Sequence, residues 1–134
     1  MAAGVSDLTV LLRTLEPVLH EGVYVYSMVP AGADLGAIAA IATFREAEGT
    51  TVILPEPEAL KARLPVLFRA AWITLKVHSD LQAVGLTAAF SRALSEAGIS
   101  CNVVAAACHD HIFVPIERAG EAMQRLEALQ KAAS

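Results

Sequence analysis

Apolar and polar residues repeat along this chain at two different periods, and the change of period separates strands from helices. Between residues 71 and 77 the apolar positions alternate with the others, which predicts a strand with one buried face. Further along, apolar residues follow one face of a helix, at Leu86, Phe90, Ala93, Leu94 and Ala97. Gly98 marks the end of that helix, because glycine accepts a left-handed backbone without a Cβ clash.

The first half of the chain predicts a helix, three strands and a second, short helix. An apolar edge on residues 8–15, which Ser6 can cap and Pro17 bounds, predicts the first helix. Strands are expected at residues 23–28, 41–46 and 50–54, and the last two form a hairpin. Pro57 suits the first turn of a short helix.

The second half adds a cap, a polar turn and a last helix. Ser79 to Gln82 fits the spacing of a capping box, so we expect the helix that contains Phe90 to begin there. Strands at 102–107 and 111–114 enclose a polar tip of four residues, Cys108, His109, Asp110 and His111. The last helix is expected at residues 117–131.

Composition narrows the class of protein. The chain has 134 residues, 55% of them hydrophobic, and a mean hydropathy of +0.52, yet no uninterrupted apolar run long enough to span a membrane. A net charge of −4 without a basic cluster argues against nucleic acid as a partner. With only two cysteines and no secretion signal, we expect a cytoplasmic protein. Because so much of the chain is apolar, we expect a homodimer in which a second copy covers part of the surface.

Three stretches carry a resemblance to a known family. They are HSDLQAVGLTAAF from His78, AGISCNVVAAACHDHIFVP from Ala97, and REAEGTTVILPE from Arg45, and they are similar to small bacterial ACT-domain proteins of unknown function. More distantly, the end of the second stretch resembles the closing strand of the cytosolic arginine sensors of eukaryotes, which bind an amino acid.

The resemblance implies an α+β fold of the ferredoxin-like βαββαβ type. Two ACT-like units are expected in tandem around a shared compact core, an N-terminal ACT-like unit at residues 1–66 and a C-terminal ACT domain at residues 67–134. It also implies a regulatory protein that binds a small molecule, without catalysis, cofactor or metal.

In ACT domains the ligand lies near the turn between the first strand and the first helix, at an interface between two units. Here the resemblance assigns that turn to Ser79, Asp80, Leu81, Ala83, Val84 and Gly85. A helix N-terminus suits the carboxylate of an amino acid, and Asp110 or Glu48 could accept its ammonium group. His111 completes the polar tip, and Gly85 and Gly49 would let backbone approach the ligand closely. Taken singly, these residues are more commonly caps and turns.

Two other classes of function stay open from the sequence alone. The chain can be a structural or protein-interaction module without a ligand. It can also be a metal-dependent enzyme that uses His109, Asp110 and His111, although neither CxxC nor HxxxH spacing is present. A cysteine–histidine nucleophile is less favoured, since Cys101 and Cys108 occupy strand and turn positions where inert thiols are common.

Overall fold

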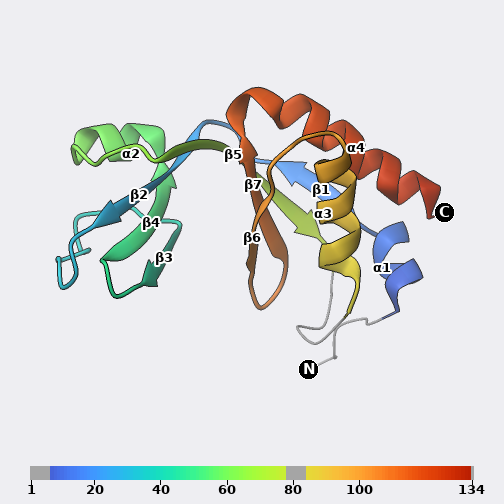
Figure 1. The fold of residues 1–134 in the computed structure, drawn as a ribbon, viewed down its shortest axis with the longest axis horizontal. Coiled ribbons are helices and arrows are strands. Elements are labelled where there is room, and N and C mark those ends of the chain that lie inside the picture. Colours follow the sequence, from blue (N-terminus) through green and yellow to red (C-terminus); the bar gives the residue numbers. More distant parts are fainter. Residues whose placement is uncertain (1–6, 78–83, 134) are drawn as a thin grey trace. The chain divides into compact units, whose positions relative to one another are not determined.

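The structure is a computed structural model that describes residues 7–77 and 84–133, and the chain forms two compact units (Figure 1). Unit 1 comprises residues 1–20 and 72–134, and unit 2 comprises residues 21–71. One strand, β5 (Phe68–Lys76), gives its first residues to unit 2 and its remaining residues to unit 1. The expected division between residues 66 and 67 differs from these units in two respects: residues 1–20 cluster with the C-terminal part, and residues 67–71 cluster with unit 2.

Unit 1 is a four-stranded sheet in the order β1-β5-β7-β6, accompanied by helices. The pairs β1 with β5 and β6 with β7 are antiparallel. Helices α3 and α4 pack on one another, and α4 also contacts β1 and β7. Its elements are α1 (Leu8–Arg13), β1 (Glu16–Leu19), the end of β5, α3 (Leu86–Glu96), β6 (Asn102–Ala105), β7 (Asp110–Pro115), a 3-10 turn η1 (Ile116–Arg118) and α4 (Ala119–Ala132).

The core of unit 1 follows from the two periods in the sequence. Alternate β5 residues Ile73 and Leu75 are fully buried, and α3 presents Phe90 and Leu94, also fully buried. At the C-terminus of α3, Arg118 donates hydrogen bonds to the carbonyl oxygens of Ala97 (2.9 Å) and Gly98 (3.4 Å). A guanidinium at this place satisfies free carbonyls and complements the helix dipole.

Unit 2 repeats the sheet order with less helix. Its order is β3-β4-β2-β5, and the pairs β2 with β4, β3 with β4, and β2 with β5 are antiparallel. A single helix, α2, packs on β2 and β4, while loop residues Leu35, Ile38 and Ala40 pack against the buried cluster. Its elements are β2 (Tyr24–Val29), β3 (Ala42–Arg45), β4 (Thr50–Pro55), α2 (Glu56–Lys61) and the start of β5.

Both units therefore have the βαββαβ strand order of the ferredoxin-like fold, which confirms the predicted fold class. In unit 1, the fourth strand is β1 from the N-terminal part of the chain, paired with the end of β5. In unit 2, the segment between β2 and β3 is a loop where this fold usually has its first helix.

Three local predictions need correction. The residue that caps α1 is Asp7, whose Oδ1 accepts from the Val10 N–H at 3.1 Å. Residues Glu16–Leu19 form a strand, although Pro17 had suggested only the end of a helix. Helix α3 begins at Leu86 after the N-cap Gly85, later than the capping-box spacing predicted. Ser79, Asp80, Leu81 and Ala83 lie outside the described residues. None of the described helices is long and apolar enough to cross a membrane.

Candidate functional site

The polar tip lies between β6 and β7 and is closed by a backbone hydrogen bond from the Ala106 N–H to the His109 carbonyl, at 3.1 Å. Asp110 is the first residue of β7 and is opposite Ala105 in the register. The side chains of Asp110 and His111 point to opposite faces of the sheet, and Asp110 shares its face with the buried Ile112 and Val114. Only 8% of Asp110 is exposed, so a carboxylate stands at the buried end of a strand.

The surroundings of Asp110 disfavour its charge. Burial raises the pKa of the Asp110 carboxyl above its ordinary value, while His111 and His109 act in the opposite direction. Among the described residues, neither a lysine nor an arginine forms an ion pair with it. The neighbouring His109 has a buried Nδ1 atom without a hydrogen-bond partner in the described part of the chain. The tip thus combines an unneutralised carboxylate with an unsatisfied imidazole nitrogen.

The start of β7 lies beside the end of β5. The two strands are neighbours in the sheet, and Thr74 on β5 is hydrogen bonded to His111 on β7 at 3.0 Å. The turn that leads from β5 into α3 therefore starts close to Asp110. Of the residues predicted in this turn, Val84 is 84% exposed and Gly85 has a left-handed backbone with φ of 102°. A Cβ at Gly85 would lie 3.1 Å from the Leu8 side chain, so packing also favours glycine there.

Glu48 and Gly49 belong to unit 2, in the turn between β3 and β4. Glu48 is exposed. Gly49 has φ of +154°, and a Cβ there would lie only 2.6 Å from the Val29 carbonyl oxygen. The turn therefore requires glycine for its own packing. The structure brings Asp110 and His111 together with the end of β5, while Glu48 and Gly49 are part of the other unit.

A second group of polar residues occupies the other face of the unit 1 sheet, and sequence reasoning did not find it. We call it the histidine network: His20, Trp72, Thr74 and His111. The rings of His20 and Trp72 stack with centroids 3.6 Å apart and an angle of 7° between their planes. His20 Nε2 lies 2.7 Å from Thr74 Oγ1, and Trp72 Nε1 donates to His111 Nδ1 at 3.1 Å.

The histidine network has no local signature in the sequence. His20 follows β1, and its N–H donates to the Trp72 carbonyl at 2.9 Å, which continues the pairing of β1 with β5. The alternation within β5 does place Trp72 and Thr74 on one face. No spacing rule links that face to a histidine from the N-terminal part of the chain.

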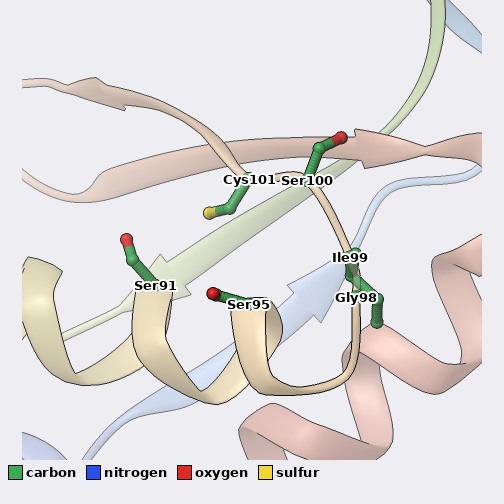
Figure 2. A pocket seen from close by; sticks show the side chains of 6 residues that line it. All are labelled: Ser91, Ser95, Gly98, Ile99, Ser100 and Cys101. Carbon is green, nitrogen blue, oxygen red and sulfur yellow. The ribbon is translucent and has the colours of Figure 1, made fainter.

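A hollow of about 440 Å³ lies at the C-terminal end of α3 (Figure 2). The Cys101 side chain points toward α3, on the side where Ser91 and Ser95 stand. Burial raises the pKa of the Cys101 thiol to about 11, against the opposing effect of a hydrogen bond with Ser91. The thiol therefore stays protonated at neutral pH, which argues against Cys101 as a nucleophile. The lining residues are Ser91, Ser95, Gly98, Ile99, Ser100 and Cys101.

The described residues of the tip do not form a metal site. Within residues 7–77 and 84–133, no group of three or more histidine, cysteine, aspartate or glutamate side chains is arranged to hold a metal ion. Nδ1 of His111 already accepts the Trp72 N–H, so that atom has no free lone pair for a metal.

Family comparison agrees with the two-unit architecture. One ACT-domain family model matches residues 3–71, and a second ACT-domain model matches residues 68–128. None of the curated proteins matches the chain.

Solved structures give the same fold. A Vibrio cholerae protein of unknown function, described as a possible transport protein, is 45% identical, with a TM-score of 0.83 over 96% of this chain and 99% of that one. An Agrobacterium tumefaciens protein is 17% identical, with a TM-score of 0.65 over 87% of this chain and 89% of its own.

The regulatory subunit of aspartate kinase from Thermus flavus is 10% identical, with a TM-score of 0.61 over 84% of this chain and 95% of that one. At such low identity, this likeness and that of the Agrobacterium protein concern the fold alone. ACT domains are non-catalytic regulatory modules that bind small molecules, and a regulatory ligand-binding role agrees with what the sequence implied. With one ACT model matched on residues 3–71 and another on 68–128, this chain belongs to the ACT-domain family.

Proposed function

We propose that this protein binds an amino acid, with the ammonium group of the ligand at Asp110 and its carboxylate at the N-terminus of α3, where the sequence placed the candidate residues 79–85. The observation that carries the proposal is the buried carboxylate of Asp110, which has no ion pair with a lysine or arginine among residues 7–77 and 84–133. A buried charge is costly unless it is paired, and a ligand cation would provide the pair. The unsatisfied Nδ1 of His109, one residue away, adds a hydrogen-bonding group at the same place.

The start of α3 suits the other end of such a ligand. Gly85 is the N-cap and has no side chain with which to satisfy the first N–H groups of the helix. Free N–H groups and the positive end of the helix dipole attract a carboxylate. Val84 is an apolar side chain left in solvent, and contact with an apolar ligand group would cover it.

A thermal-shift screen against the twenty amino acids tests this proposal. A ligand at one hundred times its Kd stabilises the folded state by about 2.7 kcal/mol, enough to raise the Tm of a domain this size by several degrees. The shift should vanish in Asp110→Asn, which keeps the shape of the side chain and removes its charge.

The matched control is Glu127→Gln, because Glu127 is an exposed carboxylate on α4 and should leave the shift unchanged. A folded wild-type protein that responds to none of the amino acids contradicts the proposal and favours the interaction module. An amino-acid shift that persists in Asp110→Asn contradicts the assignment of the ammonium site.

We also propose a homodimer in the cytoplasm. Apolar side chains on the strands of unit 2 support self-association, since Phe44 on β3 is 71% exposed and Met28 on β2 is 36% exposed. Cys101 and Cys108 are free thiols, which are typical of a reducing compartment. Light scattering at several protein concentrations would contradict the dimer if the mass stays that of one chain, and cell fractionation tests the compartment.

A further inference from the structure

The hydrogen bonds of the histidine network fix the tautomer of His111. The indole N–H of Trp72 can only donate, so His111 Nδ1, at 3.1 Å, accepts and carries no proton. The Thr74 hydroxyl, 3.0 Å from the same atom, then donates to it as well. When the Thr74 hydroxyl donates to His111, Thr74 Oγ1 accepts from His20 Nε2, 2.7 Å away, and His20 carries its proton on Nε2 in this arrangement.

The two histidines consequently respond differently to acid. A second proton on His20 goes to Nδ1, and the bond from Nε2 to Thr74 is kept. A second proton on His111 must go to Nδ1, where two donors already point at it. Charging His111 therefore removes the bond from Trp72, because two N–H groups would face one another. The contact with Thr74 can reverse, since its hydroxyl oxygen also accepts.

We propose that the bond from Trp72 to His111 is a proton-sensitive link between β5 and β7, made while His111 is neutral and lost when His111 is protonated. The groups around His111 among the described residues support this. On β5 it faces Trp72 and Thr74, which do not titrate, and on β6 its register partner is Val104. The titratable neighbours are His20, after β1, and His109 and Asp110 on its own hairpin.

The pKa directions agree with the geometry. Burial lowers the pKa of His111 below its ordinary value, His109 lowers it further, and Asp110 acts in the opposite direction. Burial also lowers the pKa of His20, and His111 adds to that effect. Because only His111 loses a hydrogen bond on protonation, we expect it to be the last of the pair to titrate as the pH falls.

The link acts on the strand that carries the proposed ligand site. His111 follows Asp110 in β7, and the two side chains point to opposite faces of the sheet. The sheet pairing of β5 with β7 remains when this bond is lost, so we expect a shift of the His111 side chain and of β7 beside Asp110, without separation of the strands. This consequence for ligand binding rests on the proposed function, whereas the proton-sensitive link itself does not.

Trp72 is the only tryptophan of the chain, so its fluorescence reports directly on the network. In ligand-free protein between about pH 8 and pH 5, we expect the emission to change with a midpoint below the ordinary histidine value of about 6.5. In His111→Asn the pH-dependent change should be lost, because the asparagine oxygen can accept from Trp72 but does not titrate. In His109→Asn, the matched control on the same hairpin, the change should remain.

His20 stacks on Trp72 and also titrates, so its effect on the emission must be separated. The change with the lower midpoint should persist in His20→Asn. Imidazole nitrogen shifts of the wild-type protein at pH 7.5 give a measurement that needs no variant, and should show His111 with its proton on Nε2.

Two results would overturn the proposal: a proton on His111 Nδ1 at pH 7.5, or an emission change that His111→Asn retains. Repeating the amino-acid screen at pH 7.5 and pH 5.5 tests the consequence for the site. An emission change that meets these expectations, with no amino acid bound at either pH, upholds the link and contradicts the proposed function.

Discussion

Units 1 and 2 have the same strand order but differ in how their sheets are covered. In unit 1, three helices, α1, α3 and α4, pack together over a core that includes Phe90 and Leu94. In unit 2, the single helix α2 and a loop with partly buried Leu35 and Ile38 cover a small cluster. The ferredoxin-like order therefore does not require its first helix, provided that loop residues fill the same apolar contacts.

The polar chemistry also differs between the units. Unit 1 holds the buried Asp110, the unsatisfied His109 and the histidine network. In unit 2, the buried polar side chains are those of Ser27 and Thr50 on paired strands, and its exposed strand residues include Phe44 and Met28. A buried titratable side chain, Asp110, is therefore found in unit 1, while the buried polar side chains of unit 2 are hydroxyls, which is why we place ligand binding in unit 1.

The largest difference should appear when the same side chain is removed from each core. Leu94 on α3 and Leu54 on β4 are both fully buried. Leu94→Ala should lower the free energy of unfolding by about 3–5 kcal/mol, because the cost rises with the cavity that remains. Leu54→Ala should cost about 2–3 kcal/mol, since the loop over unit 2 can collapse into the space.

Urea denaturation followed by circular dichroism measures both losses. The control is Leu60→Ala on α2, where the leucine is 65% exposed and the change should stay within about 0.5 kcal/mol. A larger loss at Leu54 than at Leu94 contradicts the interpretation of the unit 2 core as the more adaptable one.

A turn of unit 2 provides the next test, because Gly49 was a candidate for the ligand site. Gly49→Ala places a Cβ 2.6 Å from the backbone oxygen of Val29, in addition to the strain of a positive φ. We expect a loss of about 2–3 kcal/mol in the free energy of unfolding. Gly22→Ala is the matched control, since its φ is +99° with no atom within 4 Å of the new Cβ, and should cost about 1–2 kcal/mol. Equal losses would show that the close contact with Val29 carries no cost.

Much of this architecture could be predicted from local pattern. Alternating apolar residues predicted β5, and the helical spacing of Phe90 and Leu94 predicted α3. Burial of one face gives a strand a period of about two residues and a helix a period of about 3.6. Strand β1 was missed, since it is short, contains Pro17 and is recognisable only through its pairing with β5, distant in sequence. The start of α3 was placed too early, because a capping-box spacing can occur where no helix begins.

The candidate site also has one part that the sequence predicts and another that it does not. The position of Asp110, polar and directly before an apolar strand, was visible in the sequence. Its burial and its lack of a cation partner among the described residues depend on packing that no local spacing encodes. The hydrogen-bond partners of His111, Trp72 and Thr74, come from another strand, and His20 joins the network through Thr74, so only the sheet register reveals it.

The smallest expected effect concerns Asp110 itself and has a definite sign with pH. A raised pKa means that the folded state binds this proton more readily than the unfolded state does, so the charge of Asp110 destabilises the fold once the pH exceeds the folded-state pKa. At neutral pH, Asp110→Asn should therefore raise the Tm of the ligand-free protein, on the order of 2 °C. As the pH falls through the folded-state pKa toward the ordinary value of 3.8, the advantage should disappear, because both states then bind the proton.

The contribution of His111 to stability changes with pH in the opposite direction. Its lowered pKa removes stability as the pH falls below the unfolded value of 6.5, in the wild type and, without the opposing effect of the Asp110 charge, also in Asp110→Asn. The difference in Tm between the two proteins therefore reports mainly on Asp110, and scanning calorimetry from about pH 3.5 to pH 8 measures it. A variant that is less stable than the wild type at neutral pH would show that Asp110 serves the fold. We expect Asp110→Asn to be more stable than the wild type and to bind no amino acid, because burial disfavours the charge of Asp110 and the ligand neutralises it.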